Sequence, residues 1–266
     1  MDNLNNAKKD NFSRKTILVT GAAGFIGSRL IVELLREGHQ VIAALRNAAT
    51  KKDKLLGFIA TEGLVDPSIS LVEYDLSRDF KLDSLLSDAQ TKIHVIYHLA
   101  ASFNWGISKA EAERTNIKSG LALIEWAATL KQLERFIWIG GYRVAAPPQE
   151  SADELYCKHG GYEASKILGH QAFIEACKRL NVPWTAINPA TVIDGFYNYG
   201  DMQYIGIADM IDKLYQGRLL ALPGGRDTFL PLCNMQYIVS FLIRTMSYPE
   251  TIAQEYMLLD PATPKF

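Results

Sequence analysis

The stretch Ile17-Leu-Val-Thr-Gly-Ala-Ala-Gly-Phe-Ile-Gly-Ser28 joins an apolar, β-branched run to three regularly spaced glycines. The run predicts a short strand, and the apolar residues at helical spacing over 25–37 predict a helix. Because glycine lacks a Cβ, it permits a tight turn and a close approach of the backbone to a pyrophosphate. The free N–H groups of the following helix favour the same anion. Gly21, Gly24 and Gly27, spaced G-x-x-G-x-x-G, therefore predict a dinucleotide-binding unit.

The composition fits one large α/β domain. The chain has 266 residues, of which 48% are hydrophobic and 21% charged, which is ordinary for a globular protein. A net charge of −1 gives no global field for nucleic acid or an anionic membrane, and no apolar run is long enough to span a bilayer. Residues 1–15 are polar and lack the apolar centre of a signal peptide, so they predict a flexible tail. Three widely spaced cysteines predict reduced thiols in the cytoplasm and no metal site.

Apolar strand-like runs alternate with helical patterns through the first two thirds of the chain. This order predicts βαβ units and a doubly wound parallel sheet, a Rossmann core over residues 16–195. Residues 196–266 are rich in aromatic residues, glycine and proline, and predict a small C-terminal substrate-binding lobe. The further strands are expected at 40–45, 69–74, 93–99, 135–139 and 183–188, and the further helices at 51–61, 111–130, 161–180 and 207–216.

The residue after the second strand bears on which nucleotide is bound. An acidic side chain there would accept hydrogen bonds from the ribose hydroxyls of NAD, but this strand ends in Arg46. A guanidinium forms a planar fork against a 2′-phosphate, so the sequence favours NADP(H), with NAD(H) as the alternative. The alternative is that Arg46 is a solvated loop cation. Asp75, just beyond the third strand, either bonds the adenine amino group or caps a helix near Phe80.

Tyr162 and Lys166 predict the chemistry. Residues four apart share one face of a helix. A free tyrosine has a pKa near 10, and a lysine ammonium one turn away is expected to lower it. The phenol can then give a proton to a carbonyl oxygen as a hydride arrives, or take one from an alcohol. Lys166 can also hold the nicotinamide ribose hydroxyls.

Together, these features resemble the extended short-chain dehydrogenase/reductases, which include the NAD-dependent epimerase/dehydratases and the dihydroflavonol-reductase-like carbonyl reductases. The resemblance covers residues 15–261 and rests on the glycine motif, Asp75-Leu76, His98-Leu-Ala-Ala101, Asn116, Tyr162-x-x-x-Lys166 and Asn188-Pro-Ala-Thr-Val192. It implies that Tyr162 is the proton donor, tuned by Lys166. The cofactor contacts that it implies are Gly21, Gly24, Phe25, Ile26, Gly27, Asp75, Leu76, Leu99, Ala100, Ala101, Lys166, Pro189, Thr191 and Val192.

His98, within the fourth strand, is expected to be a core histidine rather than a catalyst. Asn116 is expected to point to solvent or to bond the backbone.

Polar and aromatic residues beyond the strand ends predict the substrate pocket. An aromatic residue belongs to the core more often than to a pocket, so a core position is the alternative for each aromatic candidate. The pocket candidates are Ser102, Phe103, Asn104, Trp105, Tyr142, Phe196, Tyr197 and Phe229.

One position departs from the family pattern. The serine or threonine that the family places after the fifth strand, to bond the substrate carbonyl, falls on Gly141. Loss of such a donor can lower the rate on the order of a hundredfold or more. The hydroxyl of Tyr142 or Ser102 could substitute, the N–H of Gly141 could donate, or the protein binds nucleotide but reduces little. Larger relatives continue beyond the position of Phe266, so either a truncated chain or a lean pocket is expected.

Three functions follow from these observations. The first is an NADP(H)-dependent reductase of an aldehyde or ketone. The second is a sugar-nucleotide epimerase or dehydratase that keeps NAD bound; Arg46 and Asn188-Pro189 favour the reductase. The third is a catalytically weak nucleotide sensor, suggested by Gly141. The resemblance also implies a homodimer through the helices near 111–130 and 161–180, although both could be covered within one chain.

Overall fold

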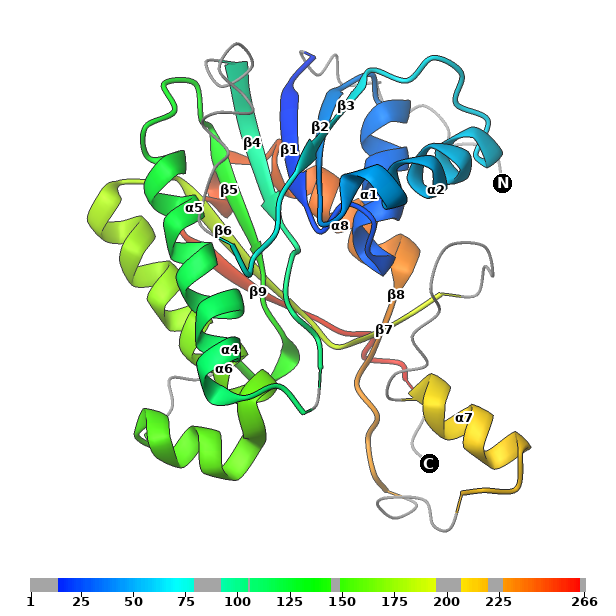
Figure 1. Cartoon of the computed structure of the whole chain (residues 1–266), viewed down its shortest axis with the longest axis vertical. Helices are drawn as coiled ribbons and strands as arrows, with labels where there is room; N and C mark the ends of the chain where they lie inside the picture. The colour runs from blue at the N-terminus through cyan, green and yellow to red at the C-terminus, as the bar shows by residue number, and fades with distance from the viewer. Residues whose placement is uncertain are drawn as a thin grey trace.

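A parallel sheet of seven strands organises the chain, in the order β3-β2-β1-β4-β5-β6-β9 (Figure 1). The computed structural model describes residues 14–78, 92–104, 106–144, 149–194, 207–219 and 227–263. The order reverses between β1 and β4, and ligands of doubly wound sheets bind at such a point, beyond the carboxyl ends of the strands. The strands are β1 (Thr16–Thr20), β2 (Gln40–Leu45), β3 (Ile69–Glu73), β4 (Ile93–His98), β5 (Arg135–Ile139), β6 (Trp184–Pro189) and β9 (Gln254–Leu258).

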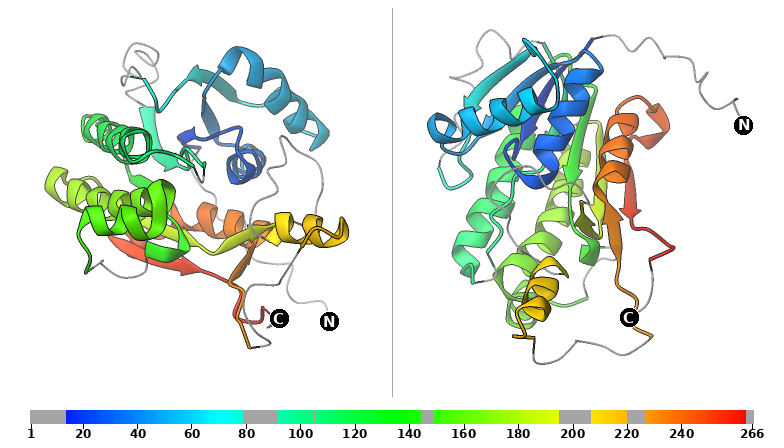
Figure 2. Two further views of the ribbon diagram at one scale, coloured as in Figure 1. Left: turned by 60° about the horizontal axis from the view of Figure 1, so that its bottom comes forward. Right: turned by 90° about the vertical axis from the view of Figure 1, so that its right-hand side faces the viewer.

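Helices cover both faces of the sheet, which confirms the predicted doubly wound class (Figures 1 and 2). One face carries α1 (Phe25–Arg36), α2 (Ala48–Thr61) and α8 (Met235–Thr245), and the other carries α5 (Ser119–Ala127) and α6 (Ala152–Leu180). Alternate residues of a strand face opposite sides, so Ile17 and Val19 pack with α1 and α8, whereas Leu18 packs with α5 and α6. Strands buried on both faces explain the nearly continuous apolar runs.

The C-terminal third contributes to the core as well as to a small lobe. β9 pairs in parallel with β6, and α8 packs against α1. The sheet therefore uses residues beyond 195, where the sequence predicted the core to end. The lobe contains a two-stranded sheet of β7 (Thr191–Ile193) and β8 (Leu232–Asn234), together with α7 (Ile207–Tyr215). Figure 1 shows this lobe beyond the carboxyl ends of the strands.

Two helices differ from the regular helices that the sequence predicts. The helix expected over 111–130 consists of α4 (Lys109–Ala112), a π-helical segment η2 (Glu113–Lys118) and α5. The helix expected over 161–180 is preceded by another helical stretch, and the two meet at a kink at Gly160, whose φ of 73° and ψ of 176° are not helical. A wider helical turn often marks a functional site, and η2 contains Asn116.

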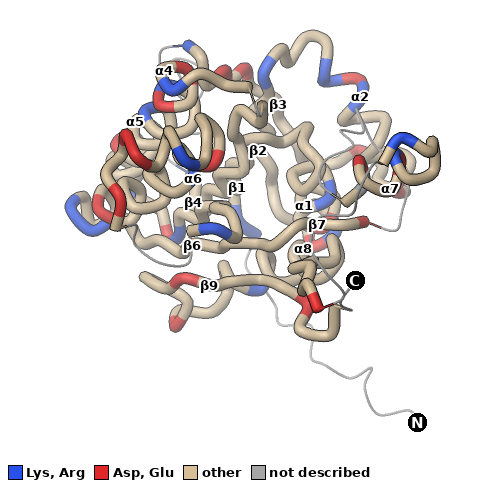
Figure 3. The backbone as a smooth tube through the Cα atoms, turned by 90° about the horizontal axis from the view of Figure 1, so that it is seen from below, with Lys and Arg blue, Asp and Glu red and all other residues tan. Residues whose placement is uncertain are grey.

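Lysine and arginine positions alternate with aspartate and glutamate positions along the outer helices (Figure 3). Within the described residues, no helix is both long enough and apolar enough to cross a membrane, and no group of three or more His, Cys, Asp or Glu side chains could hold a metal ion. The three cysteines are free, with Cys157 exposed and Cys177 and Cys233 buried.

Candidate active site

Glycines shape the turn between β1 and α1. Gly21 has a φ of 69°, and a Cβ on it would lie 2.8 Å from the backbone nitrogen of Ala100. A Cβ on Gly27 would overlap the carbonyl oxygen of Gly21, which accepts a hydrogen bond from Gly24 N at 2.9 Å. Gly24 is the N-cap of α1 and makes no side-chain cap. The N–H groups at this helix end thus fit a pyrophosphate, and the turn has no room for a side chain.

The predicted contacts at the end of β3 line a cavity of about 250 Å³ between β3 and α5. Asp75 accepts hydrogen bonds from the backbone and hydroxyl of Ser77 at 2.9 and 2.8 Å. Burial opposes the charge of Asp75, but these bonds and the nearby Arg78 and Arg46 leave its pKa lowered. Arg46 is exposed on the turn after β2. The cavity is lined by Tyr74, Asp75, Leu76, Ser77, Arg78, Arg114, Lys118, Ser119 and Ala122.

Thr20, the last residue of β1, connects the glycine turn to His98, which ends β4. A hydrogen bond of 2.8 Å joins Thr20 Oγ1 to His98 Nδ1, and the same oxygen accepts one from Ala100 N at 3.3 Å. His98 is only 3% exposed, and burial, with a smaller contribution from Lys166, lowers its pKa to about 3. His98 is therefore a neutral core histidine, as expected. Leu99, Ala100 and Ala101 continue from it, and Gly21 packs against the Leu99–Ala100 peptide.

Asn116 ties this strand end to α6. Its side-chain oxygen accepts a hydrogen bond from Ser102 N at 2.7 Å, and its amide donates to Ser102 O at 3.3 Å and to Ser165 Oγ at 3.0 Å. Ser165 in turn donates to the carbonyl of Tyr162 at 2.8 Å. Asn116 is buried, so of the two options expected from the sequence it takes backbone bonding and adds a side-chain partner.

Tyr162 and Lys166 lie just beyond the kink of α6, on one face of the helix. The ring of Tyr162 meets the ring of Phe103 edge to face at 4.6 Å between centroids. Lys166 Nζ donates to the carbonyl of Ile139, at the end of β5, at 3.0 Å. A Cβ on Gly141 would lie 3.8 Å from Lys166 Cε. The structure thus brings the tyrosine, the lysine, Phe103 and the position of the missing family hydroxyl to one edge of the sheet.

The pKa of Tyr162 differs from the expectation. Burial raises it to about 12, and the Glu163 carboxylate adds to the rise. Burial lowers the pKa of Lys166 to about 8, against an opposing effect of Glu163. The sequence predicted that Lys166 lowers the pKa of Tyr162, whereas burial raises it, and the ammonium of Lys166 bonds to the Ile139 carbonyl. Tyr162 is therefore protonated at neutral pH, which suits a proton donor.

The remaining candidates lie around this edge or outside the described part. Pro189 ends β6 in the core, and Thr191 and Val192 lie on β7, where Thr191 N donates to Pro231 O at 3.2 Å. Tyr142 begins the short helix η3 (Tyr142–Val144) and is 39% exposed, as is Phe229. Asn104 is exposed and accepts a hydrogen bond from Gly106 N at 3.0 Å. Trp105, Phe196, Tyr197 and Phe80 lie outside the described residues.

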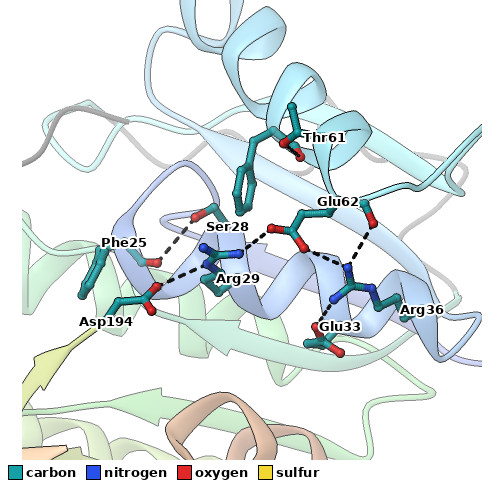
Figure 4. A network of polar contacts seen from close by, with 9 residues as sticks. Phe25, Ser28, Arg29, Glu33, Arg36, Thr61, Glu62 and Asp194 are labelled. Atoms are coloured by element: carbon teal, nitrogen blue, oxygen red, sulfur yellow. Dashed lines mark hydrogen bonds and ion pairs between the residues drawn. The ribbon is translucent and has the colours of Figure 1, made fainter. Parts of the chain in front are cut away.

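An ion-pair network on α1, which the local sequence pattern did not reveal, joins this helix to two distant segments (Figure 4). Arg29 pairs with Glu62 at 2.6 Å, beyond the end of α2, and with Asp194 at 3.4 Å, beyond the end of β7. Its guanidinium also lies 4.8 Å from the ring centroid of Phe58. Arg36 extends the network to Glu62 at 2.8 Å. Helix α1 is thereby joined to α2 and to the start of the C-terminal lobe.

A second pair that the sequence did not reveal joins the buried His170 on α6 to Glu255 on β9, at 2.7 Å. Its signal was present in the sequence, because His170 repeats the four-residue spacing of Tyr162 and Lys166. The acidic partner is 85 residues away along the chain, and no local pattern points to it.

Residues 17–255 match the NAD dependent epimerase/dehydratase family. A dihydroflavonol 4-reductase of Callistephus chinensis is 26% identical over 202 residues, which cover 70% of this chain and 54% of that protein. Cinnamoyl-CoA reductase CAD2 of Medicago truncatula is 26% identical over 193 residues, which cover 66% and 57%. The chain thus spans about half the length of the curated relatives that it matches.

Solved structures share the fold. The terminal R domain of the myxalamid PKS-NRPS pathway aligns with a TM-score of 0.77 at 21% identity, over 96% of this chain and 68% of that one. UDP-glucuronic acid 4-epimerase from Bacillus cereus in complex with NAD aligns with a TM-score of 0.70 at 22% identity, over 94% and 80%. The family match covers most of the chain and agrees with the resemblance inferred from the motifs. The chain therefore belongs to the NAD dependent epimerase/dehydratase family, within the extended short-chain dehydrogenase/reductases.

Proposed function

We propose that the chain is an NADP(H)-dependent reductase of an aldehyde or ketone carbonyl, with Tyr162 as the proton donor. The observation that carries the proposal is the pair of Tyr162 and Lys166 at the edge of the sheet where the glycine turn lies. When bound, the reduced nicotinamide supplies a hydride to the carbonyl carbon. Tyr162 gives its proton to the carbonyl oxygen, and the ammonium of Lys166 stabilises the resulting phenolate.

A continuous set of contacts joins the glycine turn to this pair. Gly21 of the turn packs against Ala100. Two residues further along, the backbone of Ser102 is held by Asn116. Asn116 also bonds Ser165, which lies between Tyr162 and Lys166 on α6. These contacts fix the glycine turn and the proposed proton donor relative to each other. Such a fixed geometry is needed to hold the nucleotide and the substrate in position for reaction. Arg46, exposed beside Asp75, is the group we propose for a 2′-phosphate.

The relatives support a reductase but also provide the alternative. The curated matches include dihydroflavonol 4-reductases, a ketoreductase of Cercospora nicotianae and cinnamoyl-CoA reductase CAD2. UDP-glucuronic acid 4-epimerase shares the fold and holds NAD. An epimerase would retain NAD and interconvert sugar nucleotides without net consumption of NAD(P)H.

We further propose a homodimer through the outer faces of α5 and α6. A measurement of the molecular mass in solution tests this proposal.

Ser102 is the group we propose in place of the family hydroxyl that Gly141 lacks. Both backbone groups of Ser102 are held by Asn116, and the adjacent Phe103 touches the ring of Tyr162. A side chain on such a fixed backbone can present a hydroxyl to the substrate carbonyl. Removing one such donor typically lowers kcat on the order of 10²-fold or more. Ser102→Ala should show this loss, and an unchanged kcat would point to the N–H of Gly141 or to Tyr142.

The decisive experiment follows NADPH oxidation with a panel of aromatic and aliphatic aldehydes and ketones. Tyr162→Phe should lower kcat on the order of 10²- to 10⁴-fold, with the dissociation constant of NADPH nearly unchanged. Tyr248→Phe, the same change at an exposed residue away from the site, serves as the control. Turnover that survives in Tyr162→Phe would contradict the assigned role. No consumption of NADPH, together with retained NAD and activity on UDP-sugars, would favour the epimerase.

A further inference from the structure

A second polar cluster lies one helical turn beyond Lys166 on α6. His170 is 2% exposed and packs between the sheet and the helix. Its Nε2 lies 2.7 Å from Oε2 of Glu255, on the edge strand β9. The side chain of Glu255 is 47% exposed, so this carboxylate reaches solvent while its partner is buried. Tyr162, Lys166 and His170 are spaced by four residues, so they share one face of α6 and lead from the proposed site toward Glu255.

The other ring nitrogen of His170 faces the end of β5. A Cβ built on Gly140 would lie 3.4 Å from His170 Nδ1 and would overlap the side-chain oxygen of Asn188, on β6. Within the described part of the chain, neither Nδ1 nor this oxygen has a hydrogen-bond partner. Buried polar atoms of this kind are normally satisfied, often by one bridging water. Gly140 keeps a side chain out of this polar niche.

Lys166 lies one helical turn before His170, and its Nζ donates to the carbonyl of Ile139, the residue before Gly140, at 3.0 Å. Its Cε lies 3.8 Å from the Cβ position of Gly141, the neighbour of Gly140. Two charged groups act on the His170 ring, Lys166 from its own helix and Glu255 from β9, while β5 and β6 present the uncharged Gly140 and Asn188. Burial lowers the pKa of His170, Glu255 raises it and Lys166 lowers it further. The imidazole is therefore in electrostatic contact with both the lysine and the solvent-facing carboxylate.

We propose that His170 and Glu255 form a proton path from solvent to Lys166, which restores the proton that Tyr162 gives up in each reduction. This inference rests on the proposed reductase function. The O–H bond of Tyr162 breaks as that of the product alcohol forms, and an N–H bond of Lys166 breaks to restore the phenol. His170 releases a proton from Nδ1, through one water, to Nζ and gains one at Nε2 from the carboxyl of Glu255, which takes it from solvent. NADPH supplies the hydride, so each turnover consumes one hydride and one solvent proton.

A purely structural role, in which the pair ties α6 to β9, makes different predictions for His170→Gln. Glutamine can still donate to Glu255 but cannot bind and release a proton. The first turnover uses the proton already on Tyr162, so the proposal predicts a burst of NADPH oxidation like that of the wild type. Later turnovers should be slower on the order of 10²-fold, with a larger solvent isotope effect and partial rescue by added imidazole. His159→Gln, the same change earlier on α6, should behave like the wild type.

Equal losses in the first and later turnovers of His170→Gln, without imidazole rescue, would overturn the path in favour of the structural role. Glu255→Gln, at a half-exposed position where misfolding is not expected, should slow the later turnovers in the same way as His170→Gln. A wild type that oxidises no NADPH with any carbonyl would contradict the proposed function instead.

A second measurement needs no turnover and separates the two proposals. Imidazole ¹⁵N NMR titration, with the His170 signal assigned by its loss in His170→Gln, reports the charge and tautomer of the ring. Glu255→Gln should lower the pKa of His170, because an anion is lost, and Lys166→Met should raise it, because a cation is lost. A ring that responds to neither variant is not coupled to its neighbours, and the path would be wrong even in an active enzyme.

Discussion

Gly21 fixes the distance between the nucleotide turn and the end of β4. Its positive φ is a conformation that other L-residues adopt only with strain, and its missing Cβ lets the Leu99–Ala100 peptide pack directly on it. Two separate constraints therefore select glycine at one residue. Gly38 shares the positive φ, at 83°, but no atom lies within 4 Å of its Cβ position. A comparison of the two positions therefore separates the effect of backbone strain from the effect of crowding by neighbouring atoms.

Gly21→Ala should lower the free energy of unfolding by about 3 kcal/mol, because backbone strain and overlap with Ala100 add. Gly38→Ala carries the strain alone and should lower it by about 1 kcal/mol. Urea unfolding measures both, and nucleotide titration should show weaker binding only for Gly21→Ala. Equal effects of the two substitutions would show that the packing on Ala100 contributes nothing.

The ionisation of Lys166 predicts the pH dependence of the reduction. Its pKa is lowered to about 8 by burial, so the ammonium predominates below pH 8 and is lost as the pH rises through that value. Tyr162, with a pKa raised to about 12, stays protonated over the same range. The kcat for carbonyl reduction should therefore fall above about pH 8. Lys166→Arg keeps its charge at all these pH values and should remove this decline. A decline that persists in the arginine variant would assign it to another group.

At the scale of the element, the kink in α6 decides where Tyr162 lies. Gly160 has φ and ψ values that essentially only glycine adopts, and Gly161 then packs against the backbone of Ile107 so closely that a Cβ would overlap its carbonyl oxygen. A straight helix through this point would move the start of the second half away from Ile107. Because of the kink, the helix face that carries Tyr162 and Lys166 is directed toward the ends of the strands.

Gly160→Ala is expected to act mainly on kcat and less on the free energy of unfolding. No atom lies within 4 Å of its Cβ position, so the substitution adds only backbone strain, about 1–3 kcal/mol, which the helix can relieve by straightening. Gly57→Ala, inside α2 and equally uncrowded, should raise stability by up to about 1 kcal/mol and leave kcat unchanged. Thermal unfolding and NADPH-oxidation rates of both variants test this, and unaltered turnover in Gly160→Ala would show that the kink does not position Tyr162.

At the scale of the whole molecule, the nucleotide site is assembled from distant segments. The turn after β1, the ends of β3 and β4, and α6 meet at one edge, and Arg29 joins α1 to α2 and to Asp194 at the start of the lobe (Figure 4). A ligand that bridges these segments binds the folded chain and not the unfolded one. Its affinity therefore appears directly as stability.

NADP⁺ at 100 times its dissociation constant should raise the free energy of unfolding by about 2.7 kcal/mol. Arg46→Ala removes the charge-assisted contact proposed for the 2′-phosphate, worth about 1.5–3 kcal/mol, so at the same concentration the gain should fall to about 0.3–1.3 kcal/mol. The gain with NAD⁺ should not change in this variant. Urea unfolding with each nucleotide measures all four cases, and equal stabilisation of Arg46→Ala and wild type by NADP⁺ would contradict the assigned role of Arg46.

Most of the fold could be predicted because it is encoded locally. β1, β2 and β5 lie at the expected residues, since their apolar runs are short and bounded by turns. α2 begins three residues earlier than expected, because the carboxylate of Glu73 accepts hydrogen bonds from Asn47 N and Ala48 N at its start. β9 was not anticipated, since its place in the sheet depends on pairing with β6.

The family, the parallel α/β class, the glycine turn and the tyrosine–lysine pair could all be inferred from the amino-acid sequence, because each depends on residues a few positions apart. By contrast, the bridge from Asn116 to Ser102 and Ser165, the contact of His170 with Glu255 and the raised pKa of Tyr162 became visible only in the folded chain. The physical reason is that desolvation and hydrogen bonding between distant segments depend on how the sheet and its helices pack, and no local spacing records that packing.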